Sequence, residues 1–326
     1  MAIVDTQTHW FSPTLLDAYV AADSYPRCQK KGDDYLFELA PGQFFPLSKT
    51  FTDVDDQMET LATHGITTIL SSSASFGDVD AMAAPMALEV AHALNEERAA
   101  LQREHPGRFF GLATVPWQDG PAALEAVERA AELGLPGVLI HSNIAGSPVD
   151  AEHCLPVYER IAALGLVLSI HPARSVAEPA LRDYGLEYLV GFMFDTSIAA
   201  LRLVLSGVMA ANPDLKVVHP HCGATLPYLA GRIDASHSQP YSLGAPLEVP
   251  PSVQLGRFYT DTVAQSADTI AFAERFYGQS HLIFGSDYPF MPPARELDFA
   301  RASVADVDAV LAGNATALFG LSTDGA

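Results

Sequence analysis

Short apolar runs alternate with longer amphipathic segments along the whole chain. The short runs are rich in Val, Ile and Leu and contain few polar positions, which is typical of parallel strands that are buried on both faces. We predict eight strands, over residues 3–9, 67–73, 109–115, 137–142, 167–171, 216–222, 258–262 and 282–287.

The longer segments between these runs carry helix signals. Residues 121–134 begin with Pro and end with Gly, and their apolar positions fall on one side of a helix. Residues 83–104, 157–165 and 198–212 give similar signals. Eight strands that are each followed by a helix predict an α/β fold, a (β/α)8 TIM barrel that forms a single domain over residues 1–326. A doubly wound open sheet is the alternative, but no Gly-rich phosphate turn follows the first strand.

Two segments interrupt the alternation. Within residues 12–52, the run Tyr35-Leu36-Phe37-Glu38-Leu39 lies between turn residues, and it predicts a small hairpin insertion after strand 1 at the catalytic face of the barrel. Residues 236–252 are rich in Pro, Ser and Gly and predict a loop after strand 6.

Composition narrows the class of protein. Hydrophobic residues make up 49% of the 326 residues, which is enough for one large core. A net charge of -21 argues against binding to nucleic acid or anionic membranes. Three cysteines without a CxxC pair argue against a disulfide framework or a cysteine zinc site. We read no signal peptide and no apolar stretch long enough to cross a bilayer, so we expect a cytoplasmic protein.

Histidine and aspartate stand where the predicted strands end. A polar side chain inside a core must be satisfied, and barrel enzymes keep their chemistry at the carboxyl ends of the strands. Any one of these residues alone fits a buried structural role, but together on one rim they indicate a site. The residues are His9, His141, His171, His219, His221, Asp261 and Asp287.

This polar set suits a metal ion. Residues i and i+2 of a strand face the same side, so Gln7 and His9 both point into the mouth of the barrel. With His171 and Asp287, His9 supplies imidazole and carboxylate donors that suit zinc, manganese or iron and leave positions open for water and substrate. None of the four lysines lies at the end of strand 4, so we expect one metal rather than a lysine-bridged pair.

At this point the sequence resembles the decarboxylase branch of the amidohydrolase superfamily, which includes 2-amino-3-carboxymuconate-6-semialdehyde, γ-resorcylate and 5-carboxyvanillate decarboxylases. The resemblance covers nearly the whole chain. Its motifs are Asp5-Thr-Gln-Thr-His9, Ser169-Ile-His171-Pro172, Tyr188-Leu-Val-Gly191, Asp195-Thr-Ser-Ile198, His221-Cys-Gly223, Gly231-Arg-Ile-Asp234, Phe258-Tyr-Thr-Asp261 and Phe284-Gly-Ser-Asp287-Tyr-Pro289.

The resemblance implies roles for individual residues. His9, His171 and Asp287 match the family's metal ligands, and His221 matches the histidine that serves as acid/base or polarises the metal-bound water. Gln7 stands where the family has His or Glu, so it is either a direct ligand or a residue that bonds a metal-bound water. The expected cofactor is one divalent ion, zinc first, with manganese as the alternative.

The implied reaction is non-oxidative decarboxylation of an aromatic or unsaturated carboxylic acid. His221 and Asp287 would be its catalytic residues, and Arg174, Trp10 and Lys49 are candidate contacts for the substrate. Hydrolysis of an amide, ester or lactone by the same residues is the first alternative. The second is a barrel that has lost its metal and only binds a small acid. We expect a homodimer or higher homo-oligomer, as among the relatives.

Overall fold

The computed structural model describes residues 2–23, 25–74, 78–175, 178–181, 183–239 and 244–322. Each predicted strand corresponds to one parallel strand. These are β1 (Ile3–His9), β5 (Ile66–Ser72), β6 (Phe109–Gly111), β7 (Gly137–His141), β8 (Val167–His171), β9 (Lys216–Val218), β10 (Thr260–Asp261) and β11 (Leu282–Ile283).

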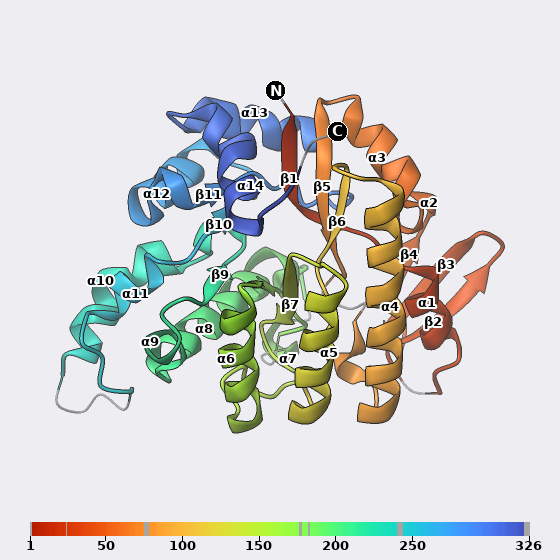
Figure 1. Ribbon diagram of the computed structural model, residues 1–326, viewed down its shortest axis with the longest axis horizontal. Helices are drawn as coiled ribbons and strands as arrows, with labels where there is room; N and C mark the ends of the chain where they lie inside the picture. The colour runs from red at the N-terminus through yellow and green to blue at the C-terminus, as the bar shows by residue number, and fades with distance from the viewer. Residues whose placement is uncertain are drawn as a thin grey trace.

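The parallel strands close into a ring. Neighbours pair in the orders β1-β5-β6, β7-β8-β9 and β10-β11, and single bridges join these groups. The bridges are Ala113–Val138, Val218–Tyr259 and Thr8–Tyr288. The last of them returns the chain to β1, so the predicted (β/α)8 barrel is confirmed, with helices around the outside of the strands (Figure 1).

Five strands are shorter than predicted, and β7 lacks only the last residue of its predicted range. β6, β9, β10 and β11 end before 115, 222, 262 and 287, respectively. After β9 and β11 the backbone turns into the left-handed region, with φ of 58° at His221, 54° at Cys222 and 60° at Asp287. The polar residues of these motifs therefore lie on turns just beyond the strands, where their side chains are aimed by the turn.

The predicted helices are present, with one correction. The segments 83–104, 121–134 and 157–165 correspond to α4 (Ala84–Glu104), α5 (Gly120–Glu132) and α6 (Leu155–Leu164). The predicted helix over 198–212 is wrong as a single element, because α8 (Phe192–Leu205) ends and α9 (Val208–Ala211) begins after Gly207. Gly207 has a φ of 89°, which a continuous helix cannot contain.

The insertion after β1 is larger than one hairpin. It contains α1 (Pro13–Val20) and a three-stranded antiparallel sheet of β2 (Arg27–Lys31), β3 (Asp34–Ala40) and β4 (Gln43–Leu47). The predicted Tyr35–Leu39 run lies in the central strand β3, which is why it is the most apolar of the three. The insertion ends with α2 (Lys49–Thr52), and α3 (Val54–Ala62) then leads into β5.

The predicted loop over 236–252 lies between two helices. α10 (Leu226–His237) precedes it and α11 (Pro251–Leu255) follows, while residues 240–243 are outside the described part. The other helices are α7 (Glu178–Leu181), α12 (Ala267–Tyr277), α13 (Pro293–Ser303) and α14 (Asn314–Phe319), with short helical turns η1 (Val79–Ala81), η2 (Glu152–Cys154), η3 (Glu187–Gly191), η4 (His221–Gly223), η5 (Gln279–His281) and η6 (Ala309–Gly313).

Two apolar layers hold the barrel together. Inside the ring, Val4, Leu139 and Val167 pack on one another and on Leu318 and Phe319 of α14, which fill the end of the barrel opposite the catalytic mouth. Outside the ring, the inner faces of α5, α6 and α8 form the largest cluster against β7 and β8. The open polar end therefore stands on a packed and rigid base.

One helical stretch combines length with apolarity. Residues Glu187–Leu205 span η3 and α8, with a mean hydropathy of 1.6, and are the one described helix that would be long and apolar enough to cross a membrane. Asp195 within it is buried and bonded to side chains of the barrel, and the helix packs on β8. The stretch Glu187–Leu205 is therefore a helix that covers the barrel and whose outward face is apolar.

Candidate metal and catalytic site

The first and last barrel strands bring His9 and Asp287 together. His9 is the final residue of β1 and is fully buried, and its Nε2 lies 3.1 Å from Asp287 Oδ1. Asp287 reaches it from the left-handed turn after β11, held by its own N–H, which donates to the Gln7 carbonyl at 2.8 Å. Two residues that are far apart in sequence thus share one point at the mouth of the barrel.

His171, at the end of β8, is the third member of this group. Its ring centroid lies 4.7 Å from that of His9, edge to face. Its Nδ1 faces the Pro172 carbonyl oxygen at 3.0 Å and therefore carries the proton, which leaves Nε2 with a free lone pair. Burial, followed by the charges of His9, His141 and His221, holds the pKa of His171 well below its ordinary value. A neutral imidazole is the form that binds metal ions.

Gln7 lies two residues before His9 on the same strand face. Its side chain is buried, and Nε2 has no hydrogen-bond partner among the described residues. Its Cβ lies only 2.8 Å from where a side chain on Gly285 would begin, so the glycine makes room for it. A buried polar atom without a partner is costly, and a bound ion or its water would satisfy this amide.

His221 stands beside the group on the η4 turn. Its backbone N–H donates to Asp261 Oδ1 at 2.8 Å, and its Nδ1 is buried without a partner in the described structure. Burial lowers the pKa of His221, and the charge of Asp287 opposes this shift. The ring is therefore neutral near pH 7 and able to accept a proton.

These residues fit a divalent cation by donor type. Two imidazoles and one carboxylate are the ligands of many catalytic metal sites. Within the described ranges, no three His, Cys, Asp or Glu side chains already surround one point as a complete ion site. His9 Nε2 and Asp287 Oδ1 lie 3.1 Å apart and the His171 ring lies against that of His9, so these three are the residues that would hold an ion.

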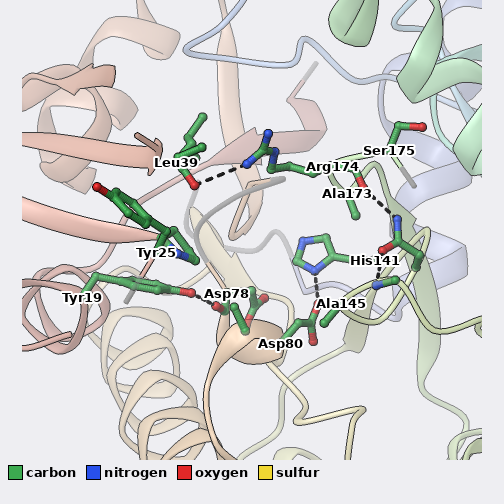
Figure 2. Close-up of a pocket in the computed structure, with 15 residues that line it drawn as sticks. Tyr19, Tyr25, Leu39, Asp78, Asp80, His141, Ala145, Ala173, Arg174 and Ser175 are labelled. Carbon is green, nitrogen blue, oxygen red and sulfur yellow. Dashed lines mark hydrogen bonds and ion pairs between the residues drawn. The ribbon is translucent and has the colours of Figure 1, made fainter. Parts of the chain in front are cut away.

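A cavity of about 480 Å³ lies beyond this group, and its described lining includes none of Gln7, His9, His171, His221 and Asp287 (Figure 2). His141 is the link, because its ring lines the cavity and lies 6.0 Å, centroid to centroid, from that of His171. His141 Nδ1 bonds Asp80 Oδ2 at 2.5 Å. Burial lowers the pKa of His141, but the bond and charge of Asp80 outweigh it and raise the pKa above the ordinary value.

The three predicted substrate contacts occupy different places. Arg174 lines the cavity, and donates to the Leu39 carbonyl at 3.3 Å and to Gln43 Oε1 at 3.2 Å. Trp10 points to the outside of β1, where it packs on Phe109 and donates to the Thr52 carbonyl. Lys49 is exposed at the start of α2 and pairs with Asp53, which precedes α3, and with Asp56 of α3. The structure brings only Arg174 to the cavity.

Residues to which the sequence assigned no role complete the site. Phe290 packs on His9 at 5.5 Å and belongs to an aromatic group with Phe45 and Phe51 from the insertion. Asp80 follows β5 on η1, and no strand-end pattern marks it. Asp195 accepts hydrogen bonds from Ser142, Asn143 and Ser175 and so fixes the loop beside Arg174. The Asp195 motif was visible in the sequence, but its partners are revealed only by the fold.

Several proteins of known function are similar to this chain in sequence and in fold. The family model described as Amidohydrolase matches residues 4–321. The chain is 31% identical to 2-amino-3-carboxymuconate-6-semialdehyde decarboxylase of Dictyostelium discoideum over 72% of its own length and 67% of the relative's. It is 27% identical to γ-resorcylate decarboxylase of a Rhizobium species, over 88% of this chain and 93% of that one.

Solved structures agree with these relatives. The 5-carboxyvanillate decarboxylase of Sphingomonas paucimobilis superposes with a TM-score of 0.87 and 27% identity, over 98% of this chain and 99% of that one. The dihydroxybenzoic acid decarboxylase of a Polaromonas species, solved with manganese and the inhibitor 2-nitroresorcinol, gives 0.79 and 25%, over 98% and 97%. The chain therefore belongs to the amidohydrolase family, in the branch that contains these decarboxylases.

Proposed function

We propose that the protein is a metal-dependent, non-oxidative decarboxylase of an aromatic or unsaturated carboxylic acid. The meeting of His9, His171 and Asp287 at the mouth of the barrel is the observation that carries the proposal. The choice of reaction rests on the relatives, which are decarboxylases by name. Hydrolases can use the same donor set, and the two reactions are distinguished by their products.

His9, His171 and Asp287 would hold the ion, and Gln7 would bind it directly or through water. When bound, a divalent ion supplies a Lewis acid that draws electron density from the oxygens of the substrate. We propose zinc, because imidazole and carboxylate are its usual ligands. Manganese, which is bound in the Polaromonas relative, is the alternative, and elemental analysis of protein purified without chelators distinguishes the two.

The protein groups would handle the proton. Breaking the bond between the ring carbon and the carboxyl carbon releases CO2 and leaves the electron pair on the ring carbon, which must take up a proton. Neutral His221 would accept the proton of the substrate's carboxyl or hydroxyl group, and that same proton, returned from His221 by way of Asp287, would reach the carbon that CO2 leaves. Arg174 would bind a substrate carboxylate at the rim through its guanidinium.

The test is release of labelled CO2 from benzoic acids, hydroxybenzoic acids and unsaturated acids that carry an isotopic label in the carboxyl group. We expect label in CO2 from at least one acid with zinc or manganese added. His221→Gln should lower kcat by about 10²-fold or more, while His92→Gln, on the surface of α4, should not change it. Cleavage of an ester, amide or lactone without labelled CO2 would contradict the proposal.

We also propose that the chain forms a homodimer. The outer face of η3 and α8 exposes Leu189, Phe194 and Ile198, with Leu189 66% exposed, and Tyr228 of α10 is another exposed apolar residue. Sedimentation should give a dimer for the wild type and a monomer for Phe194→Glu. Phe272→Glu, which places the same charge on α12, should leave the dimer intact. A monomeric wild-type protein would overturn this proposal.

A further inference from the structure

His141 has one ring nitrogen in use and one that is not. The side chain is 5% exposed, and Nδ1 bonds Asp80 Oδ2 at 2.5 Å. The other nitrogen, Nε2, is buried and makes no hydrogen bond of normal geometry in the part of the chain that the structure describes, and the Ala74 backbone interacts only weakly with the ring. Figure 2 shows the ring at the cavity, with Asp80 on one side of it. A purely structural histidine would more often have both nitrogens bonded.

Asp80 fixes the direction of the ring. Its carboxylate only accepts hydrogen bonds, so the proton of the imidazole resides on Nδ1. The η1 turn that carries Asp80 is itself fixed, because Asp78 accepts the Val79 N–H at 2.7 Å and Gln118 donates to the Val79 carbonyl at 3.0 Å. The direction of Nε2 is therefore set before any ligand enters.

The chemistry of Nε2 selects a type of group. A neutral imidazole accepts a hydrogen bond at Nε2, and a protonated one donates there. A hydroxyl group can do either, so it fits this nitrogen in both states. A hydrogen atom or an ether at the same position cannot donate a bond to it.

A hydroxyl group bound at His141 Nε2 would lie away from His9, His171 and Asp287, where the reacting carboxyl group would bind. Its ring centroid lies 6.0 Å from that of His171, within the span of one substituted benzene ring. A flat acid with its carboxyl group near His9, His171 and Asp287 would therefore place a substituent from the far side of its ring at His141. The cavity of about 480 Å³ is lined by His141 and Arg174 and not by His9, His171 or Asp287, so it has room for the part of such a ligand that is remote from the carboxyl group.

We propose that His141, oriented by Asp80, binds a hydroxyl substituent of the substrate that is remote from the reacting carboxyl group, and so determines which ring acids the enzyme accepts. The inference rests on the proposed function for the placement of the carboxyl group. Asp80 is a positioning residue, since it acts through the imidazole.

The test measures binding, separately from turnover. Benzoate and its 2-, 3- and 4-hydroxy derivatives are titrated calorimetrically into wild-type protein and into His141→Phe, with and without added manganese. We expect one hydroxybenzoate to bind the wild type about tenfold tighter than benzoate. The His141→Phe variant should lose this preference and keep its affinity for benzoate. His92→Phe is the matched control and should retain the preference.

Asp80→Asn keeps the shape of the side chain and removes its charge. We expect it to reduce the ratio of hydroxybenzoate to benzoate affinity without changing benzoate binding, which loss of structure alone would not do. A hydroxyl preference that persists in folded His141→Phe, or its absence from the wild type, overturns the inference. Absence of CO2 release with an intact, His141-dependent preference would instead refute the proposed function and leave the hydroxyl contact standing.

Discussion

Gln7 is the residue at which the first-strand motif departs from the resemblance described above. It lies two residues before His9, its carbonyl accepts the Asp287 N–H, and the resemblance leads us to expect His or Glu in its place. We expect Gln7→Glu to bind manganese at least about tenfold more tightly, or about 1.4 kcal/mol, because a carboxylate adds a full charge to the site. Gln7→Leu, which lacks a donor atom, should weaken binding. Equal manganese affinities for all three proteins would exclude Gln7 from the site.

The pKa of Asp261 predicts how the stability of the protein depends on pH. Burial, followed by the charge of Asp287, raises its pKa from 3.8 to about 8. The folded protein thus keeps a proton that the unfolded chain releases above about pH 4, so the stability contributed by Asp261 is lost as the pH rises to about 8. Asp261→Asn keeps the oxygen that accepts the His221 N–H.

The measurement is urea unfolding of metal-free protein at about pH 6 and pH 8. We expect the wild type to lose about 2 kcal/mol more than Asp261→Asn over this interval. The difference between the two proteins removes the contribution of histidines, which titrate in both. Parallel pH profiles would show that Asp261 is already ionised in the folded state.

At this scale the sequence predicts residues on strands better than residues on turns. His9 and His171 end their strands in the expected direction, and Asp287 was expected at the rim, because the period of two in a strand settles which side chains enter the barrel. The same rule places Trp10, one residue after His9, on the opposite side. Asp80 was not predictable, since its partner His141 is 61 residues away and only the closed ring brings them together.

Among the elements, the η4 turn carries the tightest constraint. Gly223 has a φ of 72°, and a Cβ there would lie 2.1 Å from the Tyr277 hydroxyl oxygen. We expect Gly223→Ala to destabilise the protein by about 3 kcal/mol and to displace His221. Gly231→Ala is the opposite case, because nothing lies within 4 Å of its Cβ position inside α10.

The control variant Gly231→Ala should raise the free energy of unfolding by up to about 1 kcal/mol, because alanine has a higher helix propensity than glycine. Thermal and urea unfolding of the two variants beside the wild type checks both signs. A stable Gly223→Ala protein would mean that the turn and Tyr277 can shift, and that His221 is not fixed by them.

The sequence locates the elements but not their ends. Apolar runs predict all eight barrel strands, yet β9 and β11 stop early because left-handed residues follow them, and no periodic pattern reports φ. The helix over 198–212 was extended through Gly207 for the same reason. Only the apolar centre of the insertion was visible, since its outer strands β2 and β4 are largely exposed and lack the alternation of buried strands.

For the whole molecule, the net charge of -21 should attract cations to the barrel. We expect the association constant for manganese to fall by about three- to tenfold as NaCl rises from about 0.02 to 0.2 M, because the Debye length shortens. Sucrose at matched osmolarity is the control and should have no effect. If the association constant did not depend on salt, the net charge of the protein would not contribute to manganese binding, and only the metal-binding side chains would.

The manganese content of the reconstituted and dialysed protein, measured by elemental analysis, tests most directly whether His9, His171 and Asp287 share one ion. We expect one ion per chain for the wild type and for the surface control His92→Ala, and about a tenth of that or less for folded His171→Ala and Asp287→Ala. A full ion retained by both site variants, or none bound by the wild type, would contradict this assignment.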